Sequence, residues 1–373
     1  MYSESDLAGA VEAGAISPEA AAALRDHVAA IRSTPTVDEE SFRLLTGFND
    51  IFVGIAAILI LVAVGWIGFY IGAKIMDLDV NEGPRQVGVA AAFGGFAVSI
   101  TSWLLAEYFT KQRRMALPSI LLLIGFAGGF FVGLSAVWGA NAPWLSEQFG
   151  LTTDLQHRQL AGAIGVVVGI ATAGATWLHW RRFMVPITVA VGALALVAVA
   201  VGAITAFVPA SQDSLNLMLL IAGVLVFVFA MRWDMSDRER RTRRSDVAFW
   251  LHLAAAPLIA HPVFHMLGVF DREIAGPMAG VVIALYVVFA AVALAVDRRA
   301  LLVSSLVYVL WAMYALFEQS GAVELAAALT ALVIGSALLT LSAFWQPMRR
   351  SVVGLLGKEL EGRLPPTQQL VAA

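Results

Sequence analysis

The sequence contains no cysteine, and only 14% of its 373 residues are charged. The absence of cysteine excludes disulfides, thiolate catalysis and cysteine-ligated zinc or iron–sulfur sites. Soluble globular chains have about 25% charged residues, whereas this chain is 60% hydrophobic with a mean hydropathy of +0.81. Its net charge of -3 also gives no basic field of the kind that nucleic-acid binding requires. We therefore expect a membrane protein whose main solvent is lipid and which does not bind nucleic acid.

The sequence signatures of the common enzyme classes are also missing. It has no glycine-rich phosphate loop followed by lysine, no HExxH motif and no serine in a nucleophile-elbow setting. The glycine-rich run GFAGGF lies inside a long apolar stretch with no strand before it. We therefore predict that the chain is not an enzyme and that it holds no cofactor or metal.

Long apolar runs dominate the middle of the chain. A helix needs roughly 20 apolar residues to cross a bilayer, and the sequence predicts an all-α polytopic bundle of ten such helices within residues 47–346. The first fifty residues are polar and acidic, so we expect no cleavable signal peptide. The predicted spans are 51–73, 87–109, 116–138, 160–180, 183–207, 215–231, 246–267, 276–296, 300–317 and 323–345.

The cationic residues are divided very unequally between the two sides of this ten-span arrangement. Twenty lysines and arginines fall on the side of the two termini and of the even-numbered loops, and four fall on the other side. Because cationic loops are retained in the cytoplasm, we expect both termini to be cytoplasmic. Dropping or adding one span would destroy this asymmetry, so it also supports the number of spans.

The residues before the first span, 1–46, predict a cytosolic helical hairpin followed by a linker. Gly14 stands where a helix C-cap belongs, and Ser17 with Pro18 begins a second helix. Leu24, together with Val28 and Ile31, would form the inner face of that helix. About thirty residues cannot bury much core alone, so we expect the hairpin to dock on the membrane domain, on another copy or on a protein partner.

Two cytosolic segments are candidates for contact with anionic lipid headgroups. In the tail, residues 347–373, the stretch 348–364 separates an apolar side from its cationic residues, which predicts an interfacial helix. The other segment is the loop after the sixth span, which is either a solvated loop touching anionic lipid or a docking site for an acidic protein. Its candidate contact residues are Arg238, Arg240, Arg241, Arg243 and Arg244.

The seventh span contains a concentration of ionisable side chains, in the run HLAAAPLIAHPVFH. His252, His261 and His265 are candidates for translocation or proton relay, because ionisable side chains inside a membrane are costly. A relay would suit a helix whose Pro257 and Pro262 open backbone carbonyls toward a wet cavity. The alternatives are ligation of a metal or haem, and a structural role in which His252 and His265 lie at opposite interfaces and His261 is hydrogen-bonded within the bundle. The structural role is the preferred interpretation.

Two further features concern the packing of the spans. Glu107 is a weaker transport candidate, because Lys111 four residues later can form a structural ion pair with it. Small residues four apart let helix backbones approach closely, which predicts internal packing at the following glycines. They are Gly68 and Gly72; Gly125, Gly129 and Gly133; Gly165 and Gly169; and Gly276 and Gly280.

Two stretches of the sequence carry a family resemblance. The opening LAGAVEAGAISPEAAAALRDH and the later RRMALPSILLLIGF resemble a family of bacterial predicted multi-pass membrane proteins that contain a domain of unknown function and begin with a short helical hairpin. The resemblance implies a bacterial inner-membrane protein and brings no catalytic residue with it. For the function we expect a small-solute or proton-coupled transporter. The alternative is a non-transporting scaffold or assembly factor that recruits partners through its N-terminus and arginine-rich loop.

Overall fold

The computed structural model describes two separate units of the chain, 1–42 with 369–373, and 43–368. No described residue lies in a β-strand. The described residues are 10–24, 48–77, 83–208, 214–238, 240, 242–268, 276–319, 323–357, 361–362 and 364–366.

The described part of the N-terminal unit contains a tight turn between two helical stretches, 10–12 and 18–24. Gly14 has a positive φ of 68°, which favours glycine, and the Ser17 hydroxyl accepts a hydrogen bond from the Ala20 amide at 3.1 Å. This is the turn geometry expected from Gly14 and Ser17. Leu24 is exposed and Ala21 is buried, whereas the other residues of the expected inner face lie outside the described residues.

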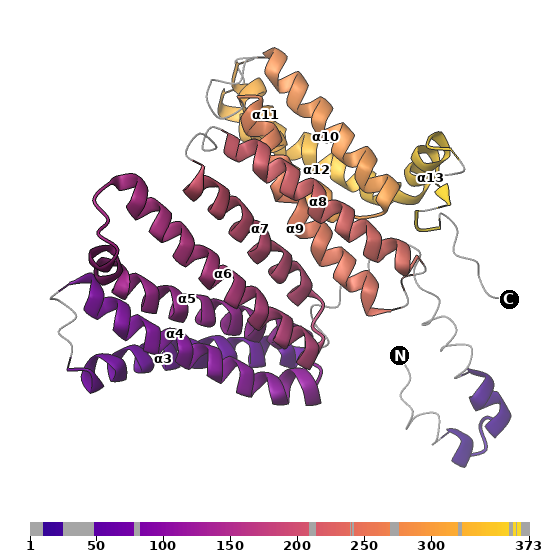
Figure 1. The fold of residues 1–373 in the computed structure, drawn as a ribbon. Helices are drawn as coiled ribbons and strands as arrows, with labels where there is room; N and C mark the ends of the chain where they lie inside the picture. Colours follow the sequence, from indigo (N-terminus) through magenta and orange to yellow (C-terminus); the bar gives the residue numbers. More distant parts are fainter. Residues whose placement is uncertain are drawn as a thin grey trace. The chain divides into compact units, whose positions relative to one another are not determined.

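The second unit is a bundle of long helices (Figure 1), and its described part contains ten helices long and apolar enough to cross a membrane. The predicted number and order of spans are therefore confirmed, and the chain is an integral membrane protein. Helices suit lipid because each one satisfies its own backbone hydrogen bonds. The spans are α3 (Phe48–Ile75), α4 (Pro84–Ala106), α5 (Ala116–Gln148), α6 (Asp154–Phe183), α7 (Ile187–Phe207), α8 (Leu215–Ser236), α9 (Arg243–Met266), α10 (Gly276–Val296), α11 (Ala300–Gln319) and α12 (Ala326–Ala343).

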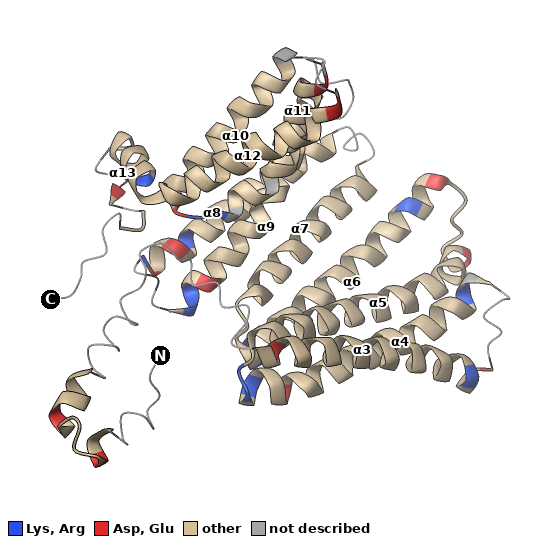
Figure 2. Cartoon of the chain, turned by 180° about the vertical axis from the view of Figure 1, so that it is seen from behind, with Lys and Arg blue, Asp and Glu red and all other residues tan. Residues whose placement is uncertain are grey.

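Three shorter helical elements complete the described bundle. The π-helix η1 (Glu107–Gln112) continues α4, the 3-10 turn η3 (Val323–Leu325) precedes α12, and α13 (Trp345–Leu355) follows it. Figure 2 shows that the charged residues gather at helix ends and turns. We call the end formed by the η1–α5, α6–α7, α8–α9 and α10–α11 turns and by α13 the arginine-rich end.

Helices α4 and α5 pack closely through glycine. A Cβ atom on Gly95 would lie 2.6 Å from the Gly133 nitrogen, and one on Gly129 would lie 2.6 Å from the Gly95 oxygen. Real Cβ atoms do not approach so closely, so the contact requires glycine at these positions. The glycine prediction is therefore confirmed for α5, but it was wrong for Gly165 and Gly280, where an added Cβ would meet nothing within 4 Å.

Helix α9 packs against α7, α8 and α11 and runs unbroken from Arg243 to Met266, with Pro257 and Pro262 inside it. The two prolines therefore do not interrupt the helix. Many of the buried residues of α9 have small side chains, among them Ala255 and Ala260. The neighbouring helices can therefore approach α9 closely.

The apolar side of the tail helix α13 is only partly covered by the bundle. Val353 is buried in a cluster with Ala295 and Leu364, whereas Leu356 is exposed. Arg349, expected away from the apolar side, is 1% exposed. The sequence pattern predicted an amphipathic helix, but it could not show that the bundle buries Val353 and Arg349.

Candidate functional site

A buried cluster of charged and polar side chains lies near the arginine-rich end of α8 and α9. It consists of Asp234 in the last turn of α8, His252 in α9 and Arg298 in the α10–α11 turn, each no more than 2% exposed. The imidazole Nε2 of His252 lies 2.8 Å from Asp234 Oδ2. Arg298 donates through Nε to Asp234 Oδ2 at 3.2 Å, and through a terminal nitrogen to Oδ1.

Arg298 connects the Asp234 carboxylate to the α10–α11 turn. The preceding residue, Asp297, has a left-handed φ of 59°, and the Arg298 amide closes the α10 end by donating to the Ala293 carbonyl at 2.9 Å. The guanidinium also donates to the Ser245 carbonyl at 3.1 Å. The carboxylate of Asp234 therefore joins α8, α9 and the α10–α11 turn. Buried charges need such pairing, because removing one partner leaves an uncompensated charge.

A second network surrounds Asp297 on the same turn. Arg240 donates to Asp297 Oδ2 at 2.9 Å, and the Trp345 indole donates to Oδ1 at 2.7 Å. Arg349 Nε lies 3.6 Å from the same Oδ1. Burial lowers the pKa of the Arg349 guanidinium, and the Asp297 carboxylate opposes that shift. Asp297 therefore fixes α13 to the α8–α9 and α10–α11 turns.

Two arginines hold the end of the described tail. Arg349 donates to the carbonyls of Pro365 at 2.6 Å and Pro366 at 3.1 Å. Arg238 donates twice to the Leu364 carbonyl, at 3.0 and 2.8 Å. Guanidinium groups suit such sites because they present several donors in a fixed plane.

These contacts change the interpretation of the arginine loop. Arg238 and Arg240 were predicted to contact lipid or a partner, and the structure shows both engaging carbonyls or carboxylates of the chain itself. Arg243 and Arg244 are exposed and remain candidates for lipid or partner contact. Arg241 lies outside the described residues.

The three histidines of α9 fall into two separate places. His261 Nδ1 lies 3.0 Å from the Tyr308 hydroxyl, and His265 Nδ1 lies 3.0 Å from the Asn216 amide nitrogen. The two imidazole centroids are 6.1 Å apart. His252 lies nine residues earlier, about 13 Å along the axis at about 1.5 Å per residue. The structure therefore brings His261 and His265 together and leaves His252 with Asp234.

The expected structural arrangement of these histidines agrees with the structure in position. His252 lies toward the arginine-rich end of α9, His265 is in the last turn at the opposite end, and His261 is hydrogen-bonded to Tyr308 on α11. His261 is nevertheless exposed on the bundle surface. Among the described residues, no group of three or more histidine, aspartate or glutamate side chains is placed to hold a metal ion.

Glu107 has a stronger partner than the one expected. Its two carboxylate oxygens accept hydrogen bonds from Arg182 Nε and a terminal nitrogen, both at 2.7 Å. Lys111 lies 3.9 Å away. The sequence rule for neighbours on one helix found Lys111 but could not find Arg182, which lies 75 positions later. The Glu107 carboxylate thus connects η1 to the end of α6.

His179 in α6 was not singled out from the sequence. It is fully buried and packs on Trp103, Phe126 and Phe183, with ring centroids 6.0, 5.4 and 4.6 Å away. Its Nδ1 lies 3.5 Å from the Thr188 hydroxyl, and its Nε2 has no hydrogen-bond partner among the described residues. A histidine two residues before an arginine pair resembles an ordinary interfacial residue, so no local pattern predicts its burial.

Comparison of the chain with protein-family models, with curated proteins and with solved structures found no match.

Proposed function

We propose that the chain is a proton-coupled transporter of a small solute in a bacterial inner membrane, with both termini in the cytoplasm. The observation that carries the proposal is the buried cluster of Asp234, His252 and Arg298, which joins three elements of the membrane unit. The asymmetry of lysine and arginine supports the orientation, and the family resemblance supports the bacterial inner membrane.

The chemistry of the cluster suits coupling to protons. Imidazole is the side chain whose charge changes near neutral pH. A neutral His252 donates one hydrogen bond to Asp234, whereas a protonated His252 adds a positive charge beside Arg298. That added charge would weaken the hold of Asp234 on Arg298 and so loosen the α10–α11 turn. Ionisable groups inside a membrane unit are functional candidates for this reason.

Cysteine accessibility tests the proposal directly, because the natural chain has no cysteine. Ala255 is fully buried in the middle of α9, so Ala255→Cys reports on water at that depth. In a transporter, a membrane-impermeant maleimide labels this thiol from either side as pH and candidate solute are varied. Ile124→Cys is the control, because Ile124 is exposed on the bundle surface at membrane depth. Lipid-facing thiols do not form the reactive thiolate.

The second candidate is a non-transporting scaffold, which the close packing of α9 favours. The residues Ala248, Ala255 and Ala260 are each 2% exposed or less. The N-terminal hairpin belongs to a separate unit, which would bind the protein partner. In this case Ala255→Cys stays unlabelled from both sides under every condition. The protein would also copurify with one partner in fixed stoichiometry, and deleting residues 1–42 would release that partner.

A further inference from the structure

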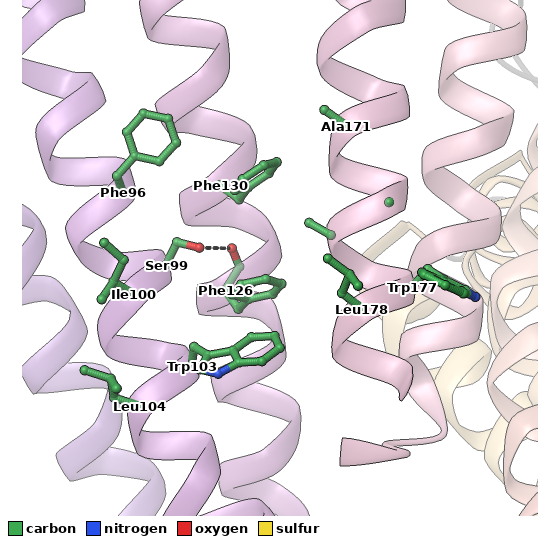
Figure 3. A pocket seen from close by; sticks show the side chains of 12 residues that line it. Phe96, Ser99, Ile100, Trp103, Leu104, Phe126, Phe130, Ala171, Trp177 and Leu178 are labelled. Carbon is green, nitrogen blue, oxygen red and sulfur yellow. Dashed lines mark hydrogen bonds between the residues drawn. The ribbon is translucent and has the colours of Figure 1, made fainter. Parts of the chain in front are cut away.

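An apolar groove separates α6 from the closely packed pair α4 and α5. Figure 3 shows the aromatic side chains of α4 and α5 facing α6 across it. Its volume is about 630 Å³, within the range of about 300 to 1,000 Å³ that is typical of ligand sites. The Ser99 hydroxyl in the groove donates to the Phe126 carbonyl at 3.0 Å. The main lining residues are Phe96, Trp103, Phe126, Phe130, Gly174 and Leu178.

The groove exists because α6 contacts its neighbours near both of its ends and has small residues facing the groove between those contacts. At the arginine-rich end Arg182 binds Glu107, and at the other end His157 Nδ1 lies 3.3 Å from the Ser146 hydroxyl. Three of the α6 residues that line the groove, Ala171, Gly174 and Ala175, are small, and a Cβ atom added to Gly174 would meet nothing within 4 Å. The side chains of the described residues therefore leave this space unfilled.

The groove lies in the half of the membrane nearest the arginine-rich end. Its α6 residues run from Ala171 to Leu178, which is about 8 to 18 Å before the end of α6 at about 1.5 Å per residue. The hydrocarbon core of a bilayer is about 30 Å thick. Beyond Leu178, the rings of His179 and Phe183 pack on Trp103. The depth of the groove thus matches the acyl chains of one leaflet.

A cation lies just beyond the groove on the same face of α6. Arg181 follows Leu178 by three residues and Trp177 by four, the spacing of neighbours on one helix face. Its guanidinium lies over the ring of Trp177, 5.0 Å from the centroid, and Trp177 lines the groove. Since Arg182 is bound to Glu107, Arg181 is the cation placed at headgroup depth beside this apolar surface.

We propose that the groove binds one acyl chain of an anionic glycerophospholipid from the leaflet at the arginine-rich end, with the lipid phosphate at Arg181. The apolar wall of the groove favours binding of an acyl chain. The Arg181 guanidinium favours a negatively charged headgroup. This site is independent of the proposed transport function, because none of its residues belongs to the cluster around Asp234.

Native mass spectrometry of the full chain in detergent tests the chain-binding part. The added lipids are phosphatidylglycerol and phosphatidylcholine with identical acyl chains. Gly174→Leu fills the groove, and Gly165→Leu is the control, because Gly165 is on the same helix and also meets open space. We expect the wild type and Gly165→Leu to retain one phosphatidylglycerol, and Gly174→Leu to bind it at least tenfold more weakly. Equal binding by the two variants would overturn the proposal.

A second pair of variants tests the headgroup part. Arg181→Gln removes the proposed phosphate partner, and Arg299→Gln is the control, because Arg299 lies over Trp345 at 4.9 Å in the same kind of contact. We expect Arg181→Gln to bind both lipids equally and Arg299→Gln to keep the preference for phosphatidylglycerol. Oleate is added separately as a probe that has an acyl chain but no phosphate. A wild type without the preference for phosphatidylglycerol, or one that binds oleate but neither phospholipid, would contradict the proposed phospholipid site. Unchanged melting temperatures of all four variants would show that folding is intact.

Discussion

His179 and His252 are both fully buried, and both lie toward the arginine-rich end of a membrane-spanning helix, but their surroundings are opposite. His252 donates to Asp234, which also binds Arg298. His179 is enclosed by aromatic rings, and its Nδ1 makes only a long contact, 3.5 Å from the uncharged Thr188 hydroxyl. The same side chain therefore serves a charge network in α8–α11 and fills space in α4–α6.

The comparison shows two ways of joining helix ends in a membrane protein. Around His252 the ends are joined by charged hydrogen bonds, which are strong but demand that every partner be present. Around His179 the ends are joined by ring packing, which tolerates replacement by a ring of similar shape. Mutation should therefore harm the first region far more than the second.

Removing the central carboxylate should have the largest effect. Asp234→Ala leaves Arg298 buried without its countercharge, and breaking such a pair costs about 3 to 5 kcal/mol. We expect a large loss of melting temperature in detergent. The double variant Asp234→Leu with Arg298→Met removes both charges and should be less destabilised than Asp234→Ala. Asp154→Ala, at the start of α6 and exposed, is a control that should change little. A wild-type melting temperature for Asp234→Ala would show that the cluster contributes nothing to stability.

Removing the imidazole should cost less. His252→Phe keeps a ring in place but loses one hydrogen bond to a charged group, for which about 1.5 to 3 kcal/mol is expected. The loss is smaller because Arg298 still compensates Asp234. The melting temperature should fall between those of the wild type and Asp234→Ala. An effect equal to that of Asp234→Ala would mean that His252, rather than Arg298, neutralises the carboxylate.

The sequence predicted what depends on local pattern and missed what depends on distant partners. Ten spans follow from the length of each apolar run, and the α4–α5 contact follows from Gly129 and Gly133. In contrast, Asp234 and Arg298 are 64 positions apart, and the predicted sixth span ends at residue 231, before Asp234. Nothing in the local pattern shows that the α10–α11 turn folds back onto α8.

Breaking the ion pair between η1 and α6 should lower the melting temperature less than either Asp234→Ala or His252→Phe. Both partners are more than 30% exposed, and exposed pairs contribute about 0.2 to 1 kcal/mol. Glu107→Gln should therefore lower the melting temperature slightly, and Lys111→Gln should lower it less, because Lys111 lies 3.9 Å from Glu107 whereas Arg182 lies 2.7 Å away. Raised salt should reduce the difference between Glu107→Gln and the wild type. A larger effect of Lys111→Gln would identify the intrahelical pair as the dominant one.

Replacing the second buried histidine, His179, should change the melting temperature least. Unlike the other changes, it should not lower the melting temperature. His179→Phe removes a buried Nε2 that has no hydrogen-bond partner among the described residues, and removing a polar group of that kind is nearly neutral or stabilising. The new ring would pack among Trp103, Phe126 and Phe183, whose centroids already lie within 6.0 Å. The loss is the contact with the Thr188 hydroxyl, which is long at 3.5 Å. We therefore expect an equal or higher melting temperature, measured beside His252→Phe in the same detergent. A loss as large as that of His252→Phe would show that His179 has a polar partner and that the two regions are built alike.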